Sequence, residues 1–144
     1  MSEYELGTPL STFVDAIQES ILDELSDVQF YAGIANESPD TISRLLITSI
    51  TGDEYGHART QAALLHQLSP QTPAGTPVAA PPNTGYVEDI QAAIVGETNA
   101  VARYAYLASI APTLGIRYLL TSVLGDEYGH IRTWYALLQN ILPC

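Results

Sequence analysis

Gly-Asp-Glu-Tyr-Gly-His at residues 52–57 recurs unchanged at residues 125–130, and each copy is followed by one variable residue and then Arg-Thr. A shift of 73 residues places Ala16–Leu68 on Asp89–Ile141 without a gap, and 24 of the 53 aligned pairs are identical. Two copies are too few for a solenoid. The repeat therefore predicts a duplicated helical hairpin with pseudo-twofold symmetry.

A proline-rich segment separates the two copies. Ser69–Gly85 contains five of the nine prolines and no charged residue, so neither a helix nor a strand is expected there. Its 17 residues span about 50 Å in an extended form, whereas a helix of about 20 residues is about 30 Å long. The segment is therefore long enough to run along a helical bundle and to start the second hairpin at the opposite end.

Capping residues, prolines and apolar periodicity predict four helices around this crossover. Their expected limits are Thr8-Pro9 to about Asn36, Ser38-Pro39-Asp40 to about Leu68, Thr84–Tyr86 to near Ile110, and about Pro112 to Leu142-Pro143. The short turn within each hairpin makes its helices antiparallel neighbours. We predict an all-α four-helix bundle that forms a single domain over residues 1–144. Its parts are the first repeat (10–68), the crossover (69–85) and the second repeat (86–142).

The composition limits the classes of partner. Sixteen acidic residues stand against five arginines and no lysine, for a net charge of −11. Such a surface repels nucleic acid and anionic lipid, so neither a nucleic acid nor a membrane is expected as a partner. No secretory signal opens the sequence and no apolar run is long enough to span a bilayer, so a cytoplasmic protein is expected. The single cysteine, Cys144, excludes an internal disulfide and a CxxC site.

Each expected helix has one inward stripe at three- to four-residue spacing, apolar at its ends and ionisable near its centre. The ionisable residues are Glu24, Glu54, His57, Glu97, Glu127 and His130. Four carboxylates in a core would repel one another and lose their hydration, and none of the five arginines lies on a stripe. Two divalent cations would balance this charge. We therefore expect Glu54–His57 and Glu127–His130 to hold and bridge two metals, with Glu24 and Glu97 as terminal ligands.

This arrangement of one Glu on each of two helices and Glu-x-x-His on each of the other two resembles the di-iron carboxylate proteins of the ferritin-like superfamily. The resemblance covers roughly 110 of the 144 residues. It implies a ferritin-like four-helix bundle with two iron ions, and manganese or a mixed pair stays open. Many di-iron proteins share the Asp-Glu-x-x-His pattern. Asp53 and Asp126 are therefore expected to accept the free ring N–H of a metal-bound histidine, the alternative being a solvated position.

The spacing of Glu24 from Tyr31 and of Glu97 from Tyr104 resembles that in rubrerythrins. This implies reduction of hydrogen peroxide or dioxygen. The electrons would come from a separate donor protein, since the chain has no CxxC pair. Tyr31 and Tyr104 are expected to act in catalysis, by bonding a ligand carboxylate or carrying an electron, and plain core packing is the alternative. Ala100 stands where rubrerythrins have an extra Glu.

Other readings stay open. The first alternative is a ferritin-type ferroxidase or iron store, and others are an oxidase of an organic substrate or a non-catalytic structural metalloprotein. Asp27 stays open as a further ligand. Gly56 and Gly129 are expected at a close approach between helices, with a substrate opening as the alternative. The apolar faces of Tyr118–Leu142 predict a homodimer.

Overall fold

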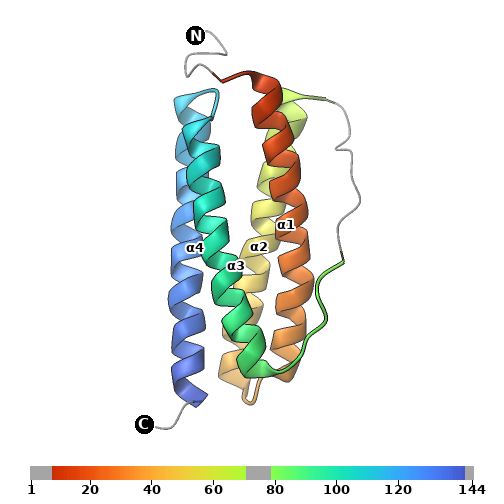
Figure 1. The fold of residues 1–144 in the computed structure, drawn as a ribbon, viewed down its shortest axis with the longest axis vertical. Coiled ribbons are helices and arrows are strands. Elements are labelled where there is room, and N and C mark those ends of the chain that lie inside the picture. Colours follow the sequence, from red (N-terminus) through yellow and green to blue (C-terminus); the bar gives the residue numbers. More distant parts are fainter. Residues whose placement is uncertain (1–7, 71–78, 142–144) are drawn as a thin grey trace.

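The computed structural model describes residues 8–70 and 79–141. These residues form four helices, α1 (Leu10–Glu37), α2 (Thr41–Leu68), α3 (Tyr86–Ser109) and α4 (Leu114–Ile141). In Figure 1, α1 and α4 run from top to bottom, whereas α2 and α3 run from bottom to top. The predicted all-α bundle of two antiparallel hairpins is confirmed over the described part of the chain, which contains no strand.

The two hairpins pack closely within themselves and meet along two seams. α1 lies against α2 and α3 lies against α4, while α1 contacts α3 and α2 contacts α4 across the seams. The end of α2 and the start of α3 lie at opposite ends of the bundle (Figure 1). The connection between them must therefore span the length of the bundle, as its proline-rich sequence predicts.

Two apolar clusters occupy the ends of the bundle and leave its middle to the ionisable residues. The cluster at the start of α1 includes Phe13, Ile17, Leu65, Leu107 and Leu120. The cluster at the other end includes Ile34, Ile47, Ile90, Trp134 and Leu137. The inward stripes therefore bury apolar side chains on both sides of the centre, which holds the four helices at fixed positions around it.

The helix boundaries agree with the expected ones to within about two residues at the described ends, but the cap of α2 differs. Ser38 was the expected cap, with Pro39 in the first turn. Instead Asp40 caps the helix and accepts a hydrogen bond from the Ser43 backbone N–H at 2.8 Å. Ser38 donates its hydroxyl proton to the Asp40 carbonyl at 2.9 Å and so stabilises the turn before the helix. The expected end of α4 at Leu142-Pro143 lies outside the described residues.

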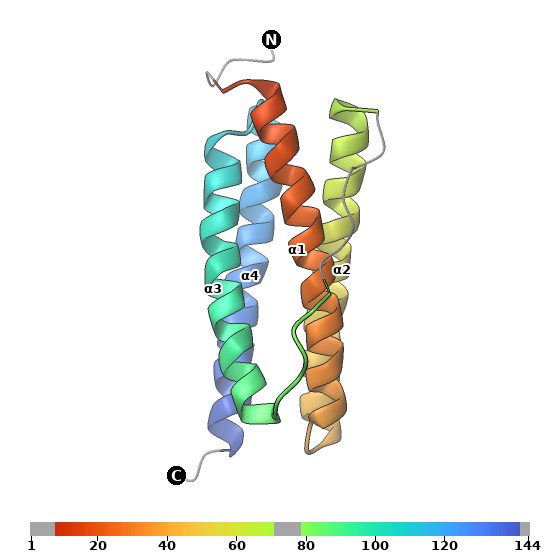
Figure 2. The same ribbon diagram turned by 45° about the vertical axis from the view of Figure 1, so that its right-hand side comes forward.

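The last residues of the crossover are anchored on α1. Asn83 Nδ2 donates to the Phe30 carbonyl at 3.3 Å, and a Cβ added to Gly33 would meet Asn83 Oδ1 at 1.8 Å. Gly33 thus makes room for this contact. The equivalent residue of the second repeat is Tyr106, which is 51% exposed. Figure 2 shows the segment that leads into α3 lying along the lower half of α1.

The helices of the described residues do not include one that is both long and apolar enough to cross a bilayer.

Candidate metal centre

The six residues predicted as metal ligands lie together between the two apolar clusters. Their donor atoms form two groups in which all atoms lie within 4.8 Å of one another. The groups are Glu24, Glu54, His57 and Glu127, and Glu54, Glu97, Glu127 and His130. Glu54 and Glu127 belong to both groups, whereas each of the other four residues belongs to one. This is the arrangement that two bridging and two terminal carboxylates require.

The centre is closed to solvent except at its imidazole rings. All four carboxylate residues are fully buried, and the two histidines are 6% and 5% exposed. Each histidine faces the bridging glutamate of the other helix. His57 Nδ1 lies 3.0 Å from Glu127 Oε1, and His130 Nδ1 lies 2.8 Å from Glu54 Oε1. The α2–α4 side, which carries both histidines, is therefore the side on which the centre comes nearest to water.

Many of the polar atoms at the centre make no hydrogen bond within the described protein, and the close contacts between each His Nδ1 and a glutamate lack hydrogen-bond geometry. Eight of them are buried and find no hydrogen-bond partner in residues 8–70 and 79–141. They are both oxygens of Glu54 and Glu127, Oε2 of Glu24 and Glu97, and Nδ1 of His57 and His130. Leaving one such atom unsatisfied costs about 1–3 kcal/mol, and native proteins contain few of them. Carboxylate oxygens and imidazole nitrogens are suitable ligands for first-row divalent metals, so these residues fit a two-metal centre.

Burial and neighbouring carboxylates shift the pKa values of the groups at the centre. Burial and the nearby carboxylates Glu97 and Glu24 raise the pKa of Glu127 to about 10, and burial with Glu24 raises the pKa of Glu54 far above its ordinary range. Burial disfavours the charged form of His130, but the carboxylates of Glu97 and Asp53 raise its pKa to about 9. Without metal these groups would retain protons, which divalent cations would displace on binding.

An aspartate on the facing helix orients each histidine ring. His57 Nε2 lies 2.9 Å from Asp126 Oδ2, and His130 Nε2 lies 2.8 Å from Asp53 Oδ2. An ionised carboxylate only accepts hydrogen bonds, so the ring proton of each pair lies on Nε2. In the neutral ring, Nδ1 is directed at the carboxylates and is the nitrogen available to a metal. The sequence suggested the residue types of these pairs, but not that each pair joins α2 to α4.

The two tyrosines of the repeat also reach across to the other hairpin. Tyr31 Oη donates to Glu97 Oε1 at 2.8 Å, and Tyr104 Oη donates to Glu24 Oε1. Burial and the nearby carboxylates raise the pKa of both phenols, which keeps them protonated as donors. Each tyrosine therefore fixes the position of one carboxylate oxygen of a glutamate in the other hairpin.

The surroundings of the two tyrosines differ. Tyr31 packs edge-on against Trp134, with ring centroids 5.0 Å apart. Tyr104 instead accepts a hydrogen bond from Gln61 Nε2 at 2.7 Å. Trp134 and Gln61 occupy equivalent positions of the repeat. The duplication thus preserves the candidate ligands but not the residues that pack behind them.

Arg103 is a residue of the centre that the sequence interpretation missed. None of the five arginines lies on an inward stripe, yet Arg103 Nη2 donates to Glu24 Oε1 at 3.0 Å. Arg103 lies next to the inward stripe rather than on it, and its long side chain reaches the stripe from the flank. The sequence contains one indication of this role, because Arg103 is charged whereas the equivalent residue of the first repeat, Phe30, is apolar.

Asp27 and the repeated glycines lie outside the two donor groups. Burial raises the pKa of Asp27 to about 7, assisted by Glu24 and Glu97, so this carboxyl group lies near the centre without belonging to either group.

The expected close helix approach at Gly56 and Gly129 is wrong for the described residues. A Cβ added to either glycine would meet no atom of a neighbouring element within 4 Å.

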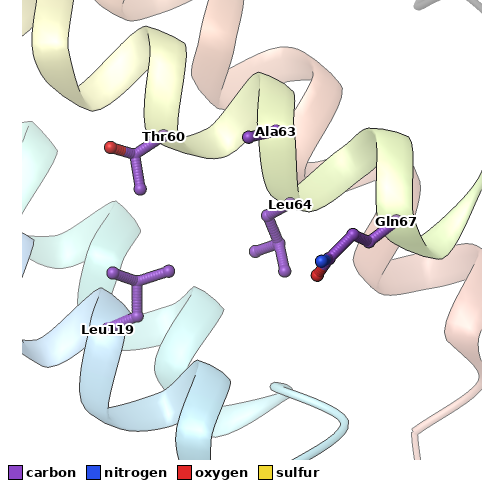
Figure 3. Close-up of a pocket in the computed structure, with 5 residues that line it drawn as sticks. All are labelled: Thr60, Ala63, Leu64, Gln67 and Leu119. Carbon is purple, nitrogen blue, oxygen red and sulfur yellow. The ribbon is translucent and has the colours of Figure 1, made fainter.

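A surface pocket lies between α2 and α4, beside the apolar cluster that contains Leu64. Its volume is about 340 Å³, and Figure 3 shows Leu119 of α4 facing four residues of α2 across it. The residues of α2 that line it are Thr60, Ala63, Leu64 and Gln67. None of the lining residues is ionisable, so the pocket provides no acid, base or metal ligand of its own.

Comparisons with known proteins identify the fold. No protein-family model and no curated protein matches the sequence. One similar solved structure is described as ferritin-like, diiron-carboxylate proteins from Bacillus anthracis str. Ames, with a TM-score of 0.79, 21% identity and coverage of 90% of this chain and 96% of that one. Another, a hypothetical protein from Pyrococcus furiosus, has a TM-score of 0.78 at 17% identity, covering 92% and 95% of the two chains. The chain therefore has the ferritin-like four-helix bundle fold.

Proposed function

We propose that the chain binds two metal ions, with iron as the expected metal, and reduces hydrogen peroxide or dioxygen with electrons from a separate donor protein. The observation that carries the proposal is the set of eight unpaired, buried donor atoms on the six candidate ligands. Without metal, Arg103 balances only one of the four buried carboxyl groups, and the other three depend on retained protons and the nearby histidines.

The residues divide the work of holding two metals. Glu54 and Glu127 contribute to both metal positions because they belong to both donor groups. Glu24 and His57 complete one position, and Glu97 with His130 completes the other. Asp126 and Asp53 keep each imidazole in the tautomer that directs Nδ1 inward.

The chemistry follows from the ligand set. Two bound iron ions supply two electrons, because hard oxygen ligands stabilise the ferric state. Reduction of hydrogen peroxide to two waters consumes two electrons and two protons, and the donor protein returns the electrons. The hydroxyl groups of Tyr31 and Tyr104 hold protons at the outer oxygens of Glu97 and Glu24. These contacts favour a rubrerythrin-like peroxidase, in which the tyrosines assist proton or electron movement.

Reconstitution with iron tests this function. Metal-free protein is loaded with Fe(II) without oxygen, the metal is counted, and hydrogen peroxide or dioxygen is added in separate experiments. We expect two ions per chain and a rise in ferric ultraviolet absorption, faster with one oxidant than with the other. A donor such as a reduced rubredoxin-type protein should then restore the ferrous state for repeated turnover.

Variants separate the centre from surface binding. Glu54→Ala and Glu127→Ala each remove a residue shared by both donor groups and should lower the metal count below two. Glu19→Ala removes an exposed carboxylate of α1 and should leave the count at two. Fewer than two ions in the unaltered protein would contradict the proposal. Continued uptake of iron far beyond two ions would instead favour storage.

A further inference from the structure

The two halves of the centre differ in charge although their candidate ligands are duplicated. Glu24 Oε1 accepts hydrogen bonds from Arg103 Nη2 at 3.0 Å and from Tyr104 Oη. Its counterpart Glu97 accepts only from Tyr31, at 2.8 Å, among the hydrogen bonds of the described side chains. A guanidinium is therefore part of one half of the centre and absent from the other half in residues 8–70 and 79–141.

Arg103 is held in this position by a set of residues found in one repeat alone. Its Nη1 donates to Asp23 Oδ2 at 3.3 Å, and its Nε donates to Ser20 Oγ at 3.2 Å. The second repeat has Gly96 and Ala93 at the positions of Asp23 and Ser20, and neither side chain can accept a hydrogen bond. The duplication has therefore diverged at three linked positions.

The guanidinium acts on the terminal glutamate in two ways. It occupies Glu24 Oε1, which leaves only Oε2 for a metal, and Oε2 is the oxygen that faces His57 at 3.9 Å. It also places a positive charge 3.0 Å from one oxygen of the carboxylate whose other oxygen, Oε2, would bind a cation. Like charges at this range in a buried setting repel strongly. Glu97 is free of this effect, and its tyrosine-bonded Oε1 lies 3.6 Å from His130 Nδ1.

We propose that the two metal positions are unequal, and that Arg103 makes the position at Glu24 and His57 the weaker one. The metal at Glu97 and His130 binds first, and the metal at Glu24 and His57 binds second and leaves first. The inference rests on the proposed two-metal centre. It assigns Arg103 as a positioning residue that sets the order of metal binding.

A limited supply of metal tests the order directly. Crystals of the unaltered protein are grown with less than one equivalent of Co(II) per chain, and the metal is located by anomalous scattering. We expect the density at Glu97 and His130. Density at Glu24 and His57, or equal density at both positions, would overturn the inference. This experiment requires no variant, so a folding defect cannot affect its outcome.

Substitution of Arg103 tests the cause. Arg103→Phe gives the second repeat the residue that the first repeat has at Phe30, and it removes the charge. In a Co(II) titration followed by visible absorption, the second binding step should tighten at least tenfold while the first changes less than threefold. Arg103→Met keeps an unbranched side chain and should have the same effect. It replaces Arg103→Phe in the titration if that variant does not fold.

A matched control and the possible outcomes complete the test. Arg132→Gln removes an exposed arginine from α4 and should change neither step. Equal tightening of both steps in Arg103→Met, or no tightening, would overturn the role of Arg103. Either result would leave the two-metal centre intact, because two ions would still bind. If the unaltered protein binds no Co(II) and no Fe(II), the proposed function itself fails.

Discussion

At the scale of single residues, the centre is built from hydrogen bonds that cross between helices. Each histidine is paired with an aspartate of the facing helix, and each terminal glutamate is bonded to a tyrosine of the other hairpin. These pairs join the hairpins along both seams. A substitution in one helix is therefore expected to disturb a ligand carried by another.

Removal of an aspartate tests this crossed arrangement. Asp126→Ala takes the acceptor from His57 Nε2 and frees the ring to rotate or to change tautomer, so metal affinity should fall by about 10–100-fold. The crossed pairing further predicts that the loss is at the His57 position rather than at His130. Cobalt titration with anomalous scattering measures both effects. Asp15→Ala, an exposed aspartate of α1, serves as the control, and an equal effect of both substitutions would refute the expectation.

A tyrosine variant separates metal binding from turnover. Tyr31→Phe retains the ring that packs on Trp134 and removes only the hydroxyl that donates to Glu97. Two metals should still bind, while peroxide turnover should fall about tenfold or more if the phenol assists proton movement. Metal analysis and stopped-flow absorption measure the two quantities. Unchanged turnover would show that the Tyr31 hydroxyl does not assist proton movement and that the side chain serves only in packing.

At the scale of the elements, the long crossover exists because α2 and α3 run in the same direction. Its last residues are fixed to the start of α3 by Asp89, which is 2% exposed. The Asp89 carboxylate accepts from Thr84 N at 3.1 Å, Thr84 Oγ1 at 3.0 Å and Asn83 Nδ2 at 3.1 Å. One side chain thus terminates the crossover and satisfies donors that precede the helix.

The pH dependence of stability should show this contribution. Burial alone would raise the pKa of Asp89, but the hydrogen bonds from Thr84 and Asn83 outweigh it and lower the pKa below its ordinary value. A lowered pKa in the folded state gives stability that is complete above the unfolded-state pKa of about 3.9 and is lost as the pH falls through the folded-state pKa. Asp89→Ala leaves the donors of Thr84 and Asn83 without this acceptor and should therefore cost about 1–3 kcal/mol at neutral pH and less in acid.

Urea denaturation of metal-free protein between about pH 3 and pH 7 measures the Asp89 contribution without interference from bound cations. Asp15→Ala again serves as the exposed control and should leave the free energy of unfolding unchanged within about 0.5 kcal/mol. A constant difference between Asp89→Ala and the unaltered protein across this range would rule out the assigned ionisation.

At the scale of the whole molecule, the outer surface of α2 and α4 carries many exposed apolar side chains. On α4, Tyr118 is 77% exposed and Leu114 is 52% exposed, and on α2, Ile42 is 67% exposed and Leu45 is 59% exposed. Each pair lies near the start of its helix, so the two groups are at opposite ends of the bundle. The homodimer predicted from the apolar faces of the last helix stays a prediction.

Light scattering at micromolar concentration tests the prediction of a homodimer. The unaltered protein should have twice the chain mass of 15.5 kDa. Tyr118→Glu places a charge among the exposed apolar side chains of α4 and should shift the protein to the monomer. Thr98→Glu, at an exposed residue of α3, should leave the mass unchanged. A monomeric unaltered protein would show that these side chains serve another purpose.

The sequence alone determined the four helices, their pairing into hairpins and the six residues that meet at the centre. The reason is that helical periodicity places Glu24, Glu54, Glu97 and Glu127 on inward stripes, and the repeat aligns those stripes with one another. The crossover was also foreseeable, because five prolines prevent a regular helix over a length that matches the bundle.

Only the tertiary structure decided which partners these residues have. The pairing of Asp126 with His57 and of Tyr31 with Glu97 depends on which helices are neighbours, and periodicity within one helix carries no such information. Arg103 was missed for a related reason, since a long flexible side chain can reach a stripe on which its Cα does not lie. The open space at Gly56 and Gly129 likewise depends on the separation of the helices, which no local pattern encodes.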